Sequence, residues 1–217
     1  MNITGKYSKI NYEENDEILA KELSKYLDNH AEEIYEFFDP TLERNIININ
    51  IMTKEKYDEL HKETYHGEVP KWSVGFYNGK CINYVSLNDY KNTSHKIDDY
   101  EEAFSYYLKT IVHEYVHFVT SEYCIKNNLD KPIKYLSEGI AQVLSGQRDN
   151  DKISFTYTTD DILNSSNYGA WYMTTKYILD VEGKTKFFEL LSNRKKAQNY
   201  VIENIDNMKM YYSKKTK

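Results

Sequence analysis

The spacing of hydrophobic and polar positions predicts amphipathic helices interrupted by a few short strands. Over residues 15–38, apolar side chains recur every three or four positions between Glu and Lys, which is the period of a helix with one buried face. Residues 45–52 instead alternate apolar and polar from Ile47 onwards and are rich in isoleucine, which predicts a strand. Thr53 then suits the N-cap of a helix that reaches about Lys62.

A β-hairpin is predicted next. Residues 72–77 and 80–87 are rich in β-branched and aromatic side chains, and Asn78-Gly79 lies between them. Asn and Gly both tolerate positive φ, so the pair predicts a type I′ turn.

The remainder of the chain predicts mostly helices. Residues 100–125 carry a broad apolar stripe, and Asp98 or Asp99 can cap this helix. Four further helices are expected over residues 136–144, 166–180, 184–191 and 195–212. Ser145-Gly146 is expected to end the first of these four. The pattern as a whole predicts an α+β protein with a small N-terminal sheet. No window approaches 18 apolar residues, so no membrane span is expected.

Candidate chemistry lies within the long helix, in His113-Glu114-Tyr115-Val116-His117. Four helical residues advance about 400° and about 6 Å, so the two imidazoles project from one face, one turn apart. Zinc takes imidazole nitrogen at about 2.0 to 2.1 Å, and a catalytic zinc uses three protein ligands and leaves the fourth position to water. Glu114 points about 100° away from His113, so it is better placed as a general base than as a ligand.

A possible third ligand follows in the segment Tyr135-Leu-Ser-Glu-Gly-Ile-Ala-Gln142, where Glu138 comes 138 − 117 = 21 positions after His117. HExxH with this downstream segment resembles the gluzincin metallopeptidases, particularly the peptidase-MA-like family. The resemblance covers about residues 45–191. It implies that His113, His117 and Glu138 bind one zinc ion and that Glu114 activates the water.

The same resemblance implies a fold. It predicts a single zincin-like catalytic domain over residues 1–217, with an upper lobe of about residues 1–127 that holds the sheet and the active-site helix. A mainly helical lower lobe would follow over about residues 128–217. The second hairpin strand, residues 80–87, is the candidate for the exposed edge that pairs with an extended substrate; an ordinary core strand is the alternative.

Two further residues take roles from the resemblance. Tyr168, at the start of a helix, is the candidate donor to the oxyanion of the tetrahedral intermediate. Gln142 stands where some gluzincins have a carboxylate that orients a zinc histidine. Its amide oxygen could accept an imidazole N–H, although it would raise ligand basicity less than a carboxylate would.

Charge, cysteine spacing and the N-terminal residues limit the expected partners, cross-links and location of the protein. The net charge of −6 gives no general attraction for nucleic acid, so no nucleic-acid partner is expected. Cys81 and Cys124 lack metal-site spacing and are expected to be small buried thiols rather than a disulfide. Residues 1–10 lack the apolar segment of a signal peptide, which favours a cytoplasmic protein; a secreted protein is the alternative if a leader has been removed.

Together these features predict a zinc-dependent metalloendopeptidase that acts on a peptide or protein substrate. An endopeptidase is favoured because the hairpin lacks the G-x-M-E-N segment of related aminopeptidases. One alternative is a zinc-binding but proteolytically silent interaction module, which would have no use for Glu114. Another is a regulatory protease dedicated to a single protein. Oligomeric state and cleavage specificity are not encoded in any recognisable pattern.

Overall fold

The chain forms two compact units, Met1–Tyr123 and Cys124–Lys217. The computed structural model describes residues 1–90, 100–152 and 154–215. The boundary between the units lies near the end of the long helix α4 (Tyr100–Lys126). The α+β class is confirmed. The predicted caps of α4, Asp98 and Asp99, lie outside the described residues.

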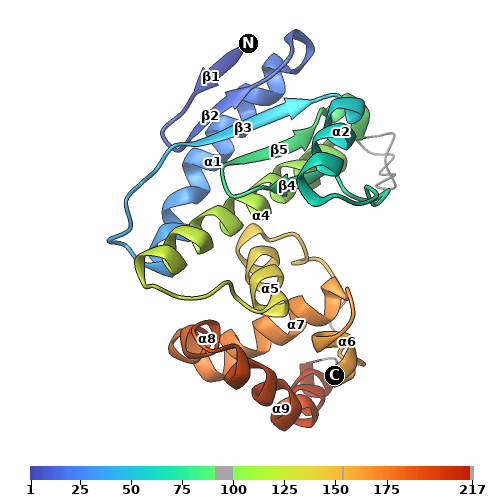
Figure 1. Cartoon of the computed structure of the whole chain (residues 1–217). Coiled ribbons are helices and arrows are strands. Elements are labelled where there is room, and N and C mark those ends of the chain that lie inside the picture. The colour runs from blue at the N-terminus through green and yellow to red at the C-terminus, as the bar shows by residue number, and fades with distance from the viewer. Residues whose placement is uncertain (91–99, 153, 216–217) are drawn as a thin grey trace. The chain divides into compact units, whose positions relative to one another are not determined.

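The first unit contains a small mixed sheet of five strands (Figure 1). Their order across the sheet is β1-β2-β3-β5-β4; β2, β3 and β5 run parallel, while β1 and β4 are antiparallel to their neighbours at the two edges. The bounds are Asn2–Thr4 for β1, Ser8–Asn11 for β2, Ile47–Met52 for β3, Gly75–Tyr77 for β4 and Cys81–Val85 for β5. The expected strand at Ile47 and the expected hairpin are therefore confirmed, whereas β1 and β2 were not predicted.

The hairpin differs from its prediction in two ways. The second strand, β5, pairs with β3 on one side and β4 on the other, so in the described part of the chain β4, and not residues 80–87, is the edge strand on this side of the sheet. The turn is also displaced by one residue, because the Asn78 N–H donates to the Cys81 carbonyl at 3.2 Å and places Gly79 and Lys80 at its centre. Only Gly79 has positive φ, at 86°, which matches a turn with glycine at the first central position rather than type I′.

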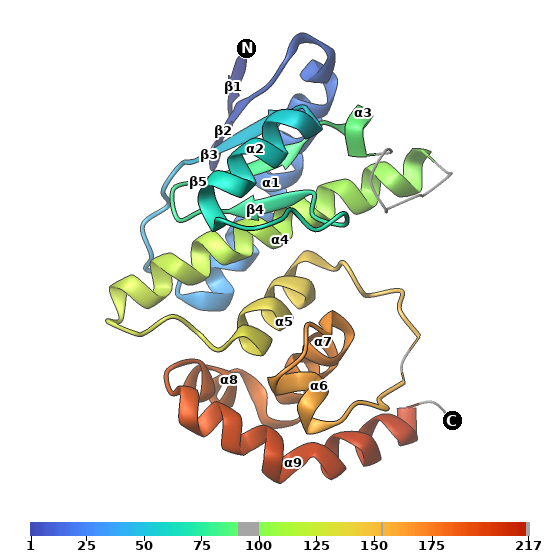
Figure 2. The ribbon, with the colours of Figure 1, turned by 45° about the vertical axis from the view of Figure 1, so that its right-hand side comes forward.

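Helices cover both faces of this sheet (Figure 2). Tyr84 on β5 meets Tyr107 of α4 edge-on, with ring centroids 4.6 Å apart. Phe76 on β4, whose side chain points to the opposite face, meets Tyr57 of α2. Helix α1 packs on the α4 side through Tyr35. The helices of this unit before α4 are η1 (Glu14–Asp16, a 3-10 helix), α1 (Glu17–Phe38), α2 (Lys54–Tyr65) and α3 (Leu87–Tyr90).

In the described residues of the second unit, helices are joined by loops and no strand is present. Its helices are α5 (Lys134–Ser145), α6 (Thr159–Leu163), α7 (Tyr168–Tyr177), η2 (Ile178–Glu182, a π-helix), α8 (Gly183–Leu191) and α9 (Arg194–Lys215). As predicted, α5 ends at Gly146, which has a left-handed φ of 66°. Helices α5 and α7 approach closely at Gly139, where an added Cβ would lie 2.6 Å from the Trp171 carbonyl oxygen. The Tyr135 hydroxyl donates to the Ala197 carbonyl at 2.9 Å, which joins α5 to α9.

Long helices in this protein are amphipathic. Helix α4 has 27 residues, and α1 and α9 have 22 each. A span of the hydrocarbon core needs about 20 predominantly apolar residues. Across the described part of the chain, no helix combines the length and the apolar character to cross a membrane.

Candidate metal centre

Helix α4 presents two imidazoles from one face. The Nε2 atoms of His113 and His117 lie 3.1 Å apart, and their rings are nearly perpendicular at 80°. As helix geometry predicts, the four-residue spacing places the two rings one turn apart on the same side of the helix.

Packing fixes the face that α4 turns to the sheet. Val112, Tyr115, Val116 and Val119 are completely buried. The Tyr107 hydroxyl donates to the Val85 carbonyl on β5 at 2.6 Å, so the helix is also held by a buried polar contact. With these residues in the core, the two histidines and Glu114 are carried on the part of the helix surface that remains.

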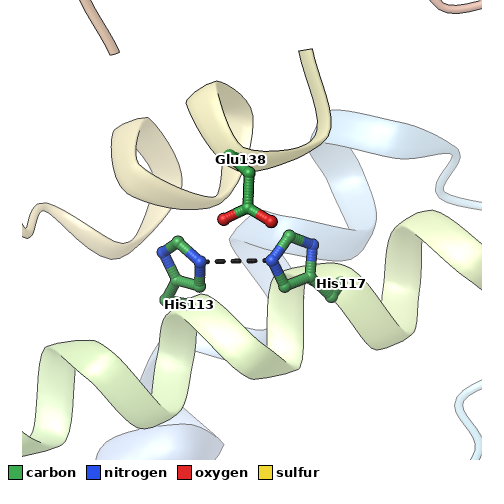
Figure 3. A group of neighbouring side chains, drawn as sticks. All are labelled: His113, His117 and Glu138. Atoms are coloured by element: carbon green, nitrogen blue, oxygen red, sulfur yellow. Dashed lines mark hydrogen bonds between the residues drawn. The ribbon is translucent and has the colours of Figure 1, made fainter. Parts of the chain in front are cut away.

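Glu138 completes a group of three candidate ligands. One ligand atom from each of His113, His117 and Glu138 lies within 4.8 Å of the others. Figure 3 shows the Glu138 carboxylate, carried by α5, pointing toward the two rings on α4. His113 is buried, with 6% of its surface exposed, and the other two side chains are half-buried. The structure thus brings together the three residues that the two motifs nominated as ligands.

The donor set suits a divalent metal ion. Two ligands at about 2.0 to 2.1 Å from a tetrahedral zinc are separated by about 3.3 Å, close to the 3.1 Å between the two imidazole nitrogens. Ligation of a metal ion through both Nε2 atoms would require each neutral ring to carry its proton on Nδ1.

Glu114 follows His113 on α4 and contacts the edge strand β4. The backbone N–H of Tyr77 on β4 donates to Glu114 Oε2 at 3.0 Å. The carboxylate is half-buried. It is not a member of the three-residue group of candidate ligands, and its role as a base stays a prediction.

Tyr168 is the first residue of α7, the helix that packs against α5 at Gly139. Asn167 caps this helix by accepting from the Ala170 N–H. The half-buried Tyr168 ring lies edge-on to Trp171, with centroids 4.9 Å apart. This placement agrees with the expected helix start, and the role of the hydroxyl stays a prediction.

Gln142 has two partners close to it in sequence. Its amide nitrogen donates to the backbone carbonyl of Glu138 at 3.1 Å, and its amide oxygen accepts from Arg148 Nε at 2.5 Å. This guanidinium donor was not predicted, and acceptance of an imidazole N–H by the same oxygen stays a prediction. Gln142 is 2% exposed, whereas the Arg148 side chain is 33% exposed, so this pairing is part-buried; it acts on the helix that bears Glu138.

Two groups near the site were not predicted. Arg148 also forms an ion pair with Asp151 at 2.5 Å. It is one of only three arginines in a lysine-rich chain, and this rarity could have singled it out in the sequence. The Tyr77 N–H could not have been identified from the sequence, because every residue except proline has a backbone N–H.

No protein-family model matches the sequence, and a search of curated proteins also gave no match.

Proposed function

We propose that this protein is a zinc-dependent metalloendopeptidase of the gluzincin type, with a zincin-like fold similar to that of the peptidase-MA-like family. The observation that carries the proposal is the grouping of His113, His117 and Glu138 within 4.8 Å, with Glu114 next to the first histidine. Two imidazoles and one carboxylate form the His₂Glu set of several catalytic zinc sites.

In this proposal the three ligands hold one zinc ion. When bound, zinc supplies Lewis acidity toward the scissile carbonyl and lowers the pKa of water. Glu114 accepts a proton from the attacking water and passes it to the leaving amine, which is general acid–base catalysis by one carboxylate. Tyr168 donates a hydrogen bond to the developing oxyanion.

The peptide would bind along the edge of the sheet. An extended chain can add to an open edge strand through backbone hydrogen bonds, and β4 is such an edge in the first unit. Because Glu114 contacts β4, a chain bound there would pass beside the proposed base. This arrangement favours cleavage within a chain over removal of a terminal residue.

Hydrolysis is tested by incubating the zinc-loaded protein with a diverse peptide mixture and mapping the products by mass spectrometry. Glu114→Gln keeps the shape of the side chain but removes the base, so it should lower turnover by about 100-fold or more. Glu122→Ala, which removes a different carboxylate from the same helix, is the matched control and should cleave normally.

Internal cleavages made by the parent and the control but not by Glu114→Gln would support an endopeptidase. Cleavage by none of the three proteins, with zinc bound in all, would contradict general peptidase activity. That result would favour a silent module or an enzyme with one protein substrate.

A further inference from the structure

The outward groups of the edge strand follow from its register. The Val85 N–H donates to the Val74 carbonyl at 3.0 Å, and the Asn78 N–H donates to the Cys81 carbonyl. In an antiparallel pair, hydrogen-bonded and non-hydrogen-bonded positions alternate. Positions 74, 76 and 78 therefore bond to β5, and the backbone groups of Gly75 and Tyr77 point away from the sheet.

Both outward groups of Tyr77 are engaged, and its carbonyl accepts a hydrogen bond from the Tyr65 hydroxyl at 3.5 Å. The Tyr77 N–H, which would otherwise be offered to an added strand, donates to Glu114 Oε2 at 3.0 Å. The Tyr77 side chain packs on α4 as well, edge-on to Phe118 with centroids 6.0 Å apart. The strand is thus joined to the helix both by its backbone and by its ring, at the turn that carries Glu114 and Phe118.

We propose that the Tyr77 backbone N–H is a positioning group for Glu114, which makes the edge strand part of the support of the proposed base. The catalytic part of this inference rests on the proposed function. A hydrogen bond from a backbone amide to a carboxylate is charge-assisted and directional, so it restricts the rotamers of Glu114 and fixes one of its oxygens. The other oxygen is then held at a defined position on the helix surface, where it can accept a proton.

The proposal limits how a peptide uses this edge. A substrate that paired with the Tyr77 N–H would have to break the hydrogen bond between this group and Glu114. The Glu114 carboxylate would then no longer be held in position to accept a proton during the reaction. Backbone pairing on β4 is therefore expected at Gly75, and the Tyr77 N–H stays with Glu114 during turnover.

The hydrogen bond is tested first without any activity measurement. Amide hydrogen exchange of Tyr77 is followed by NMR in the parent, Glu114→Ala, Glu114→Gln and Glu122→Ala. An outward edge amide exchanges fast unless it has an acceptor, so Glu114→Ala should accelerate exchange by about tenfold or more. Glu114→Gln keeps an acceptor oxygen and should retain most of the protection, and Glu122→Ala should change nothing. Equal exchange in the parent and Glu114→Ala would overturn the proposal.

The catalytic consequence is tested by comparing Tyr77→Pro with Tyr77→Ala. Both lose the ring, but only proline lacks the N–H, and proline is tolerated in an edge strand where the N–H faces outward. With equal zinc content, we expect Tyr77→Pro to have a kcat lower by about 10- to 100-fold than Tyr77→Ala, at a similar KM.

A higher KM with unchanged kcat would contradict the inference, because it would assign the N–H to substrate binding. If the parent hydrolyses no peptide, the proposed function fails, while the exchange experiment still decides whether Tyr77 holds Glu114. Should Tyr77→Pro fail to fold, the exchange data on the Glu114 variants still decide whether the Tyr77 N–H holds Glu114.

Discussion

Among single residues, Glu32 has an unusually dense set of partners. It accepts hydrogen bonds from the Tyr7 hydroxyl, from Lys6 at 3.0 Å and from Arg44 at 3.1 Å. These donors, the Tyr7 hydroxyl first among them, lower the pKa of the Glu32 carboxyl to about 2. A carboxyl with a depressed pKa in the folded state stabilises the fold above its unfolded pKa, and this contribution is lost as the pH falls toward the folded value.

Glu32→Gln should therefore destabilise the protein at neutral pH but not in acid. Because the side chain is 41% exposed and screened by solvent, we expect a loss of only about 0.5–1 kcal/mol at pH 7. The loss should shrink as the pH falls from about 4.5 toward about 2. Urea unfolding at several pH values measures it, with Glu33→Gln, an exposed neighbour on α1, as the control. A loss that does not vary with pH would count against the network.

The two cysteines should differ in reactivity. Both are free thiols; Cys124 is buried and Cys81 is half-buried, so the expected burial is confirmed only for Cys124. Burial raises the pKa of the Cys124 thiol to about 11. Since the thiolate is the reactive form, a thiol reagent should modify Cys81 at least about tenfold faster. Peptide mapping after partial labelling checks this, and faster labelling of Cys124 would contradict it.

At the scale of elements, the contact between α5 and α7 depends on a missing side chain. A Cβ at Gly139 would lie 2.1 Å from Thr175 Oγ1 and 2.6 Å from the Trp171 carbonyl oxygen, and the latter is backbone that cannot rotate away. Gly139→Ala should therefore push α5 from α7 and destabilise the protein by about 1–3 kcal/mol. Gly67→Ala, whose Cβ would meet only one atom at 3.8 Å, is the control and should be nearly neutral. Thermal unfolding that gave equal losses for both would disprove the close packing.

The elements also show what local patterns can predict. Helical periodicity fixes which side chains share a face, so His113 and His117 could be paired from sequence alone. The order of strands is set by long-range pairing, which no local pattern contains, so β5 was wrongly expected at the edge. Strands β1 and β2 have three and four residues and a largely polar sequence; they form because they pair, as Ile10 does with Ile49. The partner of Gln142 was missed for a similar reason, since Arg148 lies beyond the helix end and is brought back by a turn.

For the whole molecule, metal binding should raise the free energy of unfolding. A ligand that binds only the folded state at 100 times its Kd adds about 2.7 kcal/mol to the free energy of unfolding. For a chain of 217 residues this corresponds to a rise in Tm of about 5–10 °C. Zinc should therefore raise the Tm of the chelator-treated protein, and should not raise that of His113→Ala. An equal rise in both would indicate zinc binding elsewhere on the molecule.

The central claim, that His113, His117 and Glu138 hold one metal ion, is tested most directly by the zinc content of the purified chain. The measurement compares the parent with His113→Ala, His117→Ala, Glu138→Ala and Glu114→Gln after dialysis against a weak chelator. We expect one zinc per chain in the parent and in Glu114→Gln, because Glu114 is not among the proposed ligands. In each ligand variant the zinc occupancy should be at least about tenfold lower. Full zinc occupancy in any of the three ligand variants would contradict it.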